Sequence, residues 1–231
     1  MIQFGDCQSM EIYPLGHSSF RIKGKSLPAG RQGATLVTDP YDFAVVGLKF
    51  PKLEMVDIVT MSHQHGDHNA VSSIPGSPFT VDGPGEYEVK GVTIIGVASF
   101  HDDKNGADRG DNTIYTITID GVRICHLGDL GHKLTDEQLT RIGDVDILLI
   151  PVGGHYTINS KLATQVVAQI EPLIVVPMHY KRTGLSEKLA KDLEPLENFL
   201  KEMGAEGIAP QPKLVMSNEK LPETTTVVVL E

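Results

Sequence analysis

The chain has 231 residues, of which 40% are hydrophobic and 22% charged, so it can bury a core and is not expected to be disordered as a whole. The net charge of −10 argues against a general affinity for nucleic acids, because that affinity depends on Lys and Arg neutralising phosphates. No apolar run is long enough to span a membrane, and the first residues do not read as a secretory signal. Cys7 and Cys125 lie far apart in sequence, which excludes a disulfide framework and favours a reducing, cytoplasmic compartment.

The first half of the chain predicts short β-strands, because β-branched and alternating segments are separated by Gly and Pro. These segments are 10–15, 20–23, 34–38, 57–62, 79–81, 87–89, 92–95 and 114–119. Asp120-Gly121 then leads into a strand at 122–125, since this dipeptide between alternating runs is a strong hairpin signal. The glycine-rich segment 24–33 is expected to be a hairpin tip, and a surface tip without function is favoured over a functional loop.

After Asp129 the pattern changes to strands that alternate with helices. Thr135 and Gln138 have the spacing of a capping box, which opens a short helix. The expected elements that follow are a strand at 147–150, a helix at 161–170, a strand at 173–176, a helix at 193–203 and two terminal strands. This alternation predicts sheets covered by helices, and the absence of repeats or a Pro/Ser-rich linker predicts one domain over 1–231.

The string H-x-H-x-D-H at 63–68 places three histidines and an aspartate directly after an apolar strand. His63 and His65 project to the same side in an extended backbone, and Gly66 permits a turn that redirects Asp67 and His68. Imidazole and carboxylate without thiolate suit zinc, and also iron or manganese. The alternative is a solvated histidine-rich loop that binds metal incidentally.

Three further residues stand at the C-terminal ends of apolar segments, where open α/β sheets place their sites. They are His101 after 97–100, Asp129 after 124–128 and His179 after 174–178. Each one alone is typical of a structural residue with satisfied hydrogen bonds. Together with the string at 63–68, they predict a metal site whose ligands come from distant segments.

These residues resemble the five motifs of the metallo-β-lactamase fold superfamily: Asp39 at a strand end, then 63–68, His101, Gly128-Asp129 and His179. The pieces 15–20, 127–132, 151–154 and 177–180 are similar to a branch of small, mostly uncharacterised metal-dependent hydrolases related to ascorbate-6-phosphate lactonase. The resemblance implies an α/β fold, a four-layer αββα sandwich in which two mixed β-sheets pack face to face with helices outside.

The resemblance also implies a binuclear metal centre, with one or two Zn²⁺ ions per chain and iron or manganese as alternatives. Its ligands would be His63, His65 and His101 for one ion and Asp67, His68 and His179 for the other, with Asp129 bridging both. Asp39 would stand behind the ligands and orient a ligand histidine.

Other side chains near these motifs are candidates for further roles. Asp67 could also steer a proton to the leaving group, and His17 could contact substrate or an oxyanion or make a structural hydrogen bond. His126 is expected to be buried with a backbone partner. The candidate walls of a substrate pocket are His132, His155 and Tyr180.

The predicted function is hydrolysis of an ester, lactone, amide or phosphodiester by a metal-activated water or hydroxide, most readily in a small substrate. One alternative is a nuclease of the same superfamily acting on RNA or DNA, against which the acidic balance stands. Another is a non-catalytic metal-binding module, which is disfavoured because all seven ligand positions are present. No membrane partner is expected, and the sequence leaves the oligomeric state open.

Overall fold

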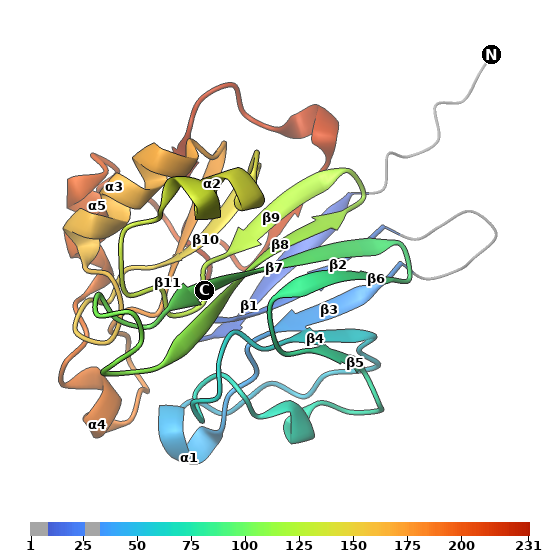
Figure 1. Cartoon of the computed structure of the whole chain (residues 1–231), viewed down its shortest axis with the longest axis horizontal. Helices are drawn as coiled ribbons and strands as arrows, with labels where there is room; N and C mark the ends of the chain where they lie inside the picture. The colour runs from blue at the N-terminus through green and yellow to red at the C-terminus, as the bar shows by residue number, and fades with distance from the viewer. Residues whose placement is uncertain (1–8, 26–32) are drawn as a thin grey trace.

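In the computed structural model, which describes residues 9–25 and 33–231, the strands form two mixed β-sheets that pack face to face (Figure 1). In pairing order, the first sheet contains β12 (Leu214–Met216), β1 (Met10–Gly16), β2 (Ser19–Lys23), β3 (Thr35–Thr38), β4 (Ile58–Thr60) and β5 (Phe79–Val81). The second contains β13 (Thr226–Val227), β11 (Ile174–Met178), β10 (Ile147–Pro151), β9 (Val122–His126), β8 (Asp111–Ile119), β7 (Val92–Phe100) and β6 (Gly85–Val89).

The helices are short and lie outside the sheets. They are α1 (Phe43–Val46), α2 (Asp136–Ile142), α3 (Ser160–Ile170), α4 (Glu187–Ala190) and α5 (Leu196–Glu202), with 3₁₀ turns at Val71–Ser73 and Asn218–Lys220. In the part of the chain that the structure describes, no helix has the length and apolar character needed to cross a membrane.

The main core lies between the two sheets. Strand side chains alternate between the two faces, so Leu36 and Ile58 of the first sheet point inward, as do Ile147 and Leu149 of the second. All four are fully buried in one continuous apolar cluster. This burial is the dominant stabilising contribution and fixes the strand register, because a one-residue slip would turn these side chains outward.

The outer faces of the two sheets are covered differently. Leu148 and Ile150 of β10 pack outward against a large cluster that includes Val166 of α3 and Phe199 of α5. Figure 1 shows α2, α3 and α5 gathered on this side of the molecule. On the first sheet, the outward residues of β3 and β4 meet a small cluster formed mainly by a loop at 50–56 and by the 3₁₀ turn and following residue at 71–74. The predicted αββα sandwich is confirmed, with one thick and one thin outer layer.

Several local predictions are confirmed. Asp120 and Gly121 both have positive φ angles, 54° and 80°, and join β8 to β9 in a tight hairpin. Thr135 caps α2, and its side chain and that of Gln138 form the predicted capping box. The helix expected at 161–170 spans 160–170.

Other elements differ from the sequence prediction. The helix expected at 193–203 begins only at Leu196, because Pro195 has an extended backbone (φ −73°, ψ 154°) and occupies the N-cap. Strand β7 joins the segments expected at 92–95 and 97–100, and β8 begins earlier than expected, because residues 111–113 pair with residues 98–100 of β7. Helices α1 and α4 were not predicted. Residues 26–32 of the expected hairpin tip, and Cys7, lie outside the described residues.

Candidate metal centre

One edge of the sandwich collects polar residues at the C-terminal ends of strands. Strands β1, β3 and β4 run in one direction within their sheet, and β7, β9 and β11 do so within the other. The residues that follow these strands are His17, Asp39, His63, His101, Asp129 and His179. The sheet topology therefore brings together groups that lie far apart in the sequence.

Asp129 lies at the middle of this group. Its Oδ2 atom is 3.2 Å from Nε2 of His68, 3.1 Å from Nε2 of His101 and 3.2 Å from Nε2 of His179. Nε2 of His63 is 3.9 Å away from the same oxygen. A single carboxylate thus faces four imidazoles that come from three different loops.

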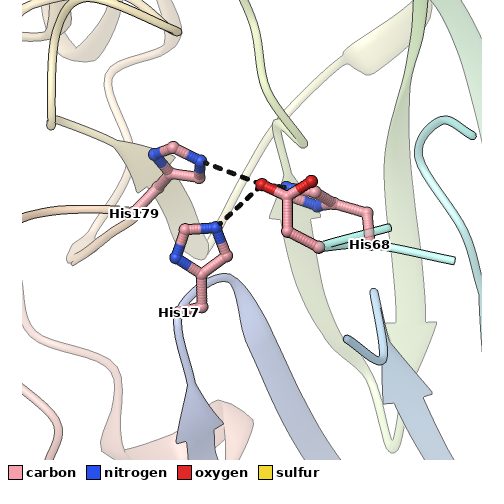
Figure 2. Close-up of side chains that lie close together, drawn as sticks. His17, His68 and His179 are labelled. Carbon is pink, nitrogen blue, oxygen red and sulfur yellow. Dashed lines mark hydrogen bonds and ion pairs between the residues drawn. The ribbon is translucent and has the colours of Figure 1, made fainter. Parts of the chain in front are cut away.

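Asp67 forms a second focus beside Asp129. Its Oδ2 atom is 3.3 Å from Nε2 of His17, 3.6 Å from Nε2 of His68 and 3.9 Å from Nε2 of His179. Figure 2 shows His17 and His179 side by side, with dashed lines from their rings to this carboxylate and His68 behind it. His68 therefore lies between the two carboxylates.

Three groups of side chains among the described residues have ligand atoms within 4.8 Å of one another and could hold a metal ion. They are His17, Asp67, His68 and His179; His63, His65 and His101; and His63, His68 and Asp129. The structure thus brings together all seven side chains expected as ligands and adds His17 to one group.

Several buried ligand atoms in this cluster lack a hydrogen-bond partner among the described residues. They are Nε2 of His63, Nε2 of His68, Nε2 of His179 and Oδ1 of Asp129. Nε2 of His68 and of His179 lie 3.2 Å from Oδ2 of Asp129 but not in hydrogen-bond geometry. Buried polar atoms without a hydrogen bond are rare in folded proteins, because burial removes their hydrogen bonds to water. A divalent cation would satisfy them, and nitrogen with carboxylate oxygen is a donor set that zinc, iron and manganese accept. The residues present therefore fit a metal centre.

Asp39 stands behind the cluster and fixes the orientation of two rings. Its Oδ2 atom accepts hydrogen bonds from Nδ1 of His68 (2.8 Å) and from Oγ of Ser62 (2.6 Å). Because the Ser62 hydroxyl donates to Asp39, its oxygen is left to accept from Nδ1 of His63 at 3.0 Å. Nε2 of both histidines is thereby directed away from Asp39. Histidines that bind a metal are commonly held in this way, by a hydrogen bond to the ring nitrogen that does not contact the ion.

Electrostatics favours ligand-competent histidines at 63 and 65. Burial, and then the charge on His68, lowers the pKa of His63 to about 3, and burial also lowers the pKa of His65. Both rings are therefore neutral at neutral pH and keep the lone pair that a metal ligand needs. Burial opposes a charge on His68, but Asp129 and Asp67 raise its pKa well above the ordinary value.

The carboxylates at the centre remain ionised. Burial alone would favour the neutral acid, but His179 and His68 hold the pKa of Asp129 well below its usual range. In the same way, His68 and His17 outweigh burial and lower the pKa of Asp67. Both aspartates therefore offer negative oxygens to a cation.

The backbone around the centre adopts conformations that cost free energy. His17, Asp39 and His179 have φ angles of 54°, 41° and 54°, which are uncommon for residues with a side chain. Gly128 has a φ of 56°, and a Cβ atom there would lie 2.3 Å from Oδ1 of Asn112. The surrounding structure holds these turns in place, and they direct the ligand side chains to one point.

His126 lies under the centre and has the backbone partners that the sequence predicted. Its Nε2 donates to the carbonyl of Ser18 at 2.8 Å, and its Nδ1 accepts from the N–H of Gly128 at 3.1 Å. The ring is fully buried, and burial lowers its pKa. It supports the turn that carries Asp129.

The three residues expected as pocket walls lie elsewhere. His132 accepts from the N–H of Phe100 and donates to the carbonyl of Lys133, so both ring nitrogens are engaged by backbone. Tyr180 is buried in the apolar cluster beneath the outer helices. His155 is half exposed, and its Nε2 lies 3.9 Å from Oδ2 of Asp192. None of the three belongs to the lining of the cavity over the centre.

That cavity has a volume of about 570 Å³ and ends on His65, Asp67, His101 and Asp129. Its remaining walls are Ala44, Val45, Gly66, Arg109, Tyr156, Ser186, Lys188 and Leu189. Most of these residues could not be anticipated from the sequence, because they lie on four-residue helices or in loops that carry no periodic pattern. Of these walls only Gly66 was named from the sequence, as the turn within the string at 63–68.

Comparison with known proteins agrees with this fold and site. Residues 11–179 match the family model described as the β-lactamase superfamily domain. A protein of Thermococcus onnurineus named UPF0173 metal-dependent hydrolase is 31% identical over 193 residues, which cover 72% of this chain and 82% of the relative. The chain therefore belongs to the β-lactamase superfamily, as the sequence motifs predicted.

Two solved structures are similar to the chain over most of its length. A Thermotoga maritima structure assigned to the Zn-dependent hydrolases of the metallo-β-lactamase superfamily is 36% identical, with a TM-score of 0.76, and the match covers 96% of this chain and 98% of the other. Igni18, a metallo hydrolase from Ignicoccus hospitalis, is 20% identical with a TM-score of 0.64, covering 90% of this chain and 97% of its own. At that identity the second match shows the shared fold alone.

Proposed function

We propose that the chain is a metal-dependent hydrolase that binds two divalent cations, with zinc as the expected metal, and hydrolyses an ester, lactone, amide or phosphodiester bond of a small substrate. The observation that carries this proposal is the set of buried ligand atoms without a hydrogen bond on His63, His68, His179 and Asp129. These atoms belong to the same cluster as His65, Asp67 and His101, which line the cavity together with Asp129. The names of the relatives support the same class of enzyme.

The proposed ligands form two overlapping sets. His63, His65 and His101 would hold one ion, Asp67, His68 and His179 the other, and Asp129 would bridge them. When bound, such ions lower the pKa of a water molecule toward neutrality and polarise the carbonyl or phosphoryl oxygen under attack. The neutral imidazoles of His63 and His65 and the ionised carboxylates of Asp67 and Asp129 support this assignment.

His17 supports the site through Asp67 in this proposal. Burial, with the nearby His179, lowers the pKa of His17 to about 4, so its ring is neutral at neutral pH. Nε2 then donates to Oδ2 of Asp67 at 3.3 Å and fixes the carboxylate. Because the pKa of Asp67 is itself lowered, this residue suits metal binding better than proton donation to a leaving group.

A small substrate is supported by the dimensions of the cavity. Its volume of about 570 Å³ lies within the roughly 300–1,000 Å³ typical of sites for small ligands. The net charge of −10 also works against a polynucleotide.

The first test is the metal content of protein purified without a histidine tag. We expect about two equivalents of zinc, iron or manganese per chain, as in other two-metal hydrolases. Asp129→Ala should lose most of this metal, because it removes the proposed bridge. His155→Ala is the matched control, since its half-exposed ring belongs to none of the three groups. Equal metal content in both variants would contradict the proposed ligand set.

The second test is activity on chromogenic esters and on bis(p-nitrophenyl) phosphate. His65→Ala should lower kcat at least about a hundredfold, because a lost ligand impairs a metal-activated nucleophile. Circular dichroism should show an intact fold, since His65 is exposed at the cavity. Faster cleavage of labelled RNA at low salt than of any small substrate would overturn the proposed substrate class.

A further inference from the structure

The cavity over the candidate metal centre has an apolar and a cationic wall. Val45 of α1 and Leu189 of α4 form the apolar part. Arg109 and Tyr156 line another part, and Lys188 of α4 adds a second positive charge. Among the described residues, the only acidic side chains that line the cavity are Asp67 and Asp129, and both are proposed metal ligands.

Arg109 is carried by a loop that one buried carboxylate organises. Oδ1 of Asp102 accepts from the N–H groups of Lys104 and Gly106, both at 2.8 Å. Its Oδ2 accepts from the N–H groups of Asp108 (3.0 Å) and Arg109 (2.7 Å). The backbone of Arg109 is therefore fixed directly, and its side chain starts from a defined position.

The guanidinium of Arg109 contacts the aromatic ring of Tyr156 and no carboxylate among the described residues. Its Cζ atom lies 5.6 Å from the centroid of Tyr156, a distance typical of a cation–π contact. The Tyr156 hydroxyl donates to Oδ2 of Asp192 at 3.1 Å, which holds the ring in place. Within the described residues the guanidinium forms no hydrogen bond besides this contact, so its N–H donors are available to a ligand.

Neither Arg109 nor Lys188 forms an ion pair within residues 9–25 and 33–231, although carboxylates are plentiful in this acidic chain. Lys104 on the same loop, by contrast, pairs with Asp108 at 2.7 Å. A partly buried arginine without a carboxylate partner keeps its strongest hydrogen bonds unused. A cleft with unpaired positive charge also concentrates anions near it.

Building on the proposed function, we infer that the cavity selects small substrates that carry an oxyanion, either a carboxylate or a phosphate, at the end away from the scissile bond. Arg109 binds this group through its planar fork of N–H donors, which matches both oxyanions. Lys188 adds charge, and the apolar part of the substrate packs on Val45 and Leu189.

The test uses three p-nitrophenyl esters that differ only at the far end. They are the esters of 4-carboxyphenylacetate, 4-phosphonophenylacetate and 4-isopropylphenylacetate, so that a neutral group of similar shape replaces the oxyanion in the third. With the metal-loaded wild-type protein, we expect kcat/KM for one or both anionic esters to exceed that for the neutral ester by about tenfold or more, the value of a charged hydrogen bond.

Variants at Arg109 then separate recognition from structure. Arg109→Gln should remove the preference for the anionic esters, so that kcat/KM falls much more for these esters than for the neutral ester. Arg109→Lys should retain part of the preference, because the charge stays and the fork is lost. Arg21→Gln is the matched control, since Arg21 also lies over a ring, that of Tyr13, but on the far side of the first sheet. It should keep the full preference.

A binding experiment distinguishes failure of this inference from failure of the proposed function. Ketone analogues, with a methylene in place of the ester oxygen, are titrated into wild type and Arg109→Gln by calorimetry. If no ester is hydrolysed but the anionic ketones bind about tenfold tighter only with Arg109 present, the anion site stands and the hydrolase proposal fails. If the ketones bind without an anion preference or not at all, or if Arg109→Gln slows all three esters equally, the anion site is refuted.

Discussion

The two sides of the candidate site are built in opposite ways. The ligand side consists of strand ends, buried side chains and backbone turns that are fixed by hydrogen bonds to Asp39, Asn112 and Ser62. The opposite wall consists of the four-residue helices α1 and α4, on which Val45 is 43% exposed. The proposed metal chemistry thus depends on the buried core. Which substrates fit the cavity depends on short surface elements, which can change at little cost in stability.

Only a few contacts join the two helices of the exposed wall. The Ser186 N–H donates to the carbonyl of Val46, and its hydroxyl donates to that of Val45, both at 2.8 Å. Gly47 permits this approach, because its φ is 86° and a Cβ there would lie 2.4 Å from the nitrogen of Ser186. Figure 1 shows α1 and α4 near each other, although they are far apart in the sequence. Substitutions on the ligand side should therefore affect stability and metal binding strongly, whereas substitutions on the exposed wall should have small effects on substrate binding.

The largest effect is expected on the ligand side, at Gly128. Gly128→Ala would force a Cβ against Oδ1 of Asn112 and displace the N–H of Asp129, which donates to that atom at 3.0 Å. We expect a loss of about 3 kcal/mol or more in the free energy of unfolding, together with loss of metal. Urea denaturation and metal analysis measure the two effects.

Gly207→Ala is the control for this prediction. Gly207 has a φ of 80°, but no atom of the described structure lies within 4 Å of the position of its Cβ. This variant should cost only about 1 kcal/mol for the backbone conformation and should keep its metal. Equal losses in both variants would mean that the contact with Asn112 is unimportant.

The next effect is expected at Asp39. Asp39→Asn weakens the acceptor that orients Nδ1 of His68, and supporting residues of this kind are worth about ten- to a hundredfold in metal affinity. Competition with a chromogenic chelator measures the change. Asp57→Asn, at a carboxylate that pairs with Lys90 away from the centre, should leave the affinity unchanged. Wild-type affinity in Asp39→Asn would show that His68 is oriented by other contacts.

A smaller effect, with a defined pH dependence, is expected at Asp102. Burial works against its charge, but four backbone N–H donors lower its pKa to about 2 from the ordinary 3.8. Its contribution to stability is therefore present above pH 3.8 and is lost as the pH falls through 2. The stability difference between wild type and Asp102→Asn should be constant near neutral pH and should shrink within that window.

Denaturation curves across this pH range test the prediction, with Asp103→Asn as the exposed neighbour that should show no such difference. Asp102→Asn should also weaken the anion preference, because the loop that carries Arg109 loosens. A stability difference that stayed constant down to pH 2 would contradict the role given to the carboxylate.

The smallest effect is expected on the exposed wall. Val45→Ser should change the free energy of unfolding by less than about 0.5 kcal/mol, as is usual for a surface position. It should raise KM for the neutral ester a few-fold, because apolar contact area in the cavity is lost. Met55→Ser, at a more exposed site outside the cavity, should affect neither quantity. A large loss of stability at Val45 would remove the contrast between the two sides.

The same contrast between the two sides explains how much of the fold and of the candidate site could be predicted from the sequence. The ligand side was predictable, because His101, Asp129 and His179 each follow an apolar segment whose pattern marks a strand. Strands β8 and β9 are joined by the tight turn at Asp120-Gly121, which fixes their register. Residues close together in the sequence were therefore enough to predict this hairpin.

The exposed wall could not be predicted in this way. Helices α1 and α4 are too short to show a helical period, and their position depends on contacts of Ser186 with residues far away in sequence. Tyr180 was expected at a pocket wall, but its side chain is buried in the apolar cluster beneath the outer helices. The position of Arg109 in the cavity could not be predicted from the sequence, because it depends on the hydrogen bonds of Asp102 that organise the loop.

The loop between β7 and β8 has one more consequence. Its ends are held at the paired residues Phe100 and Asp111, and its interior is organised by the single side chain of Asp102. The loop partners of Asp102 are backbone N–H groups, so other side chains of the loop can change without removing these hydrogen bonds. If the inferred anion site is correct, exchanging residues 103–110 while keeping His101 and Asp102 would redirect the enzyme to differently charged compounds.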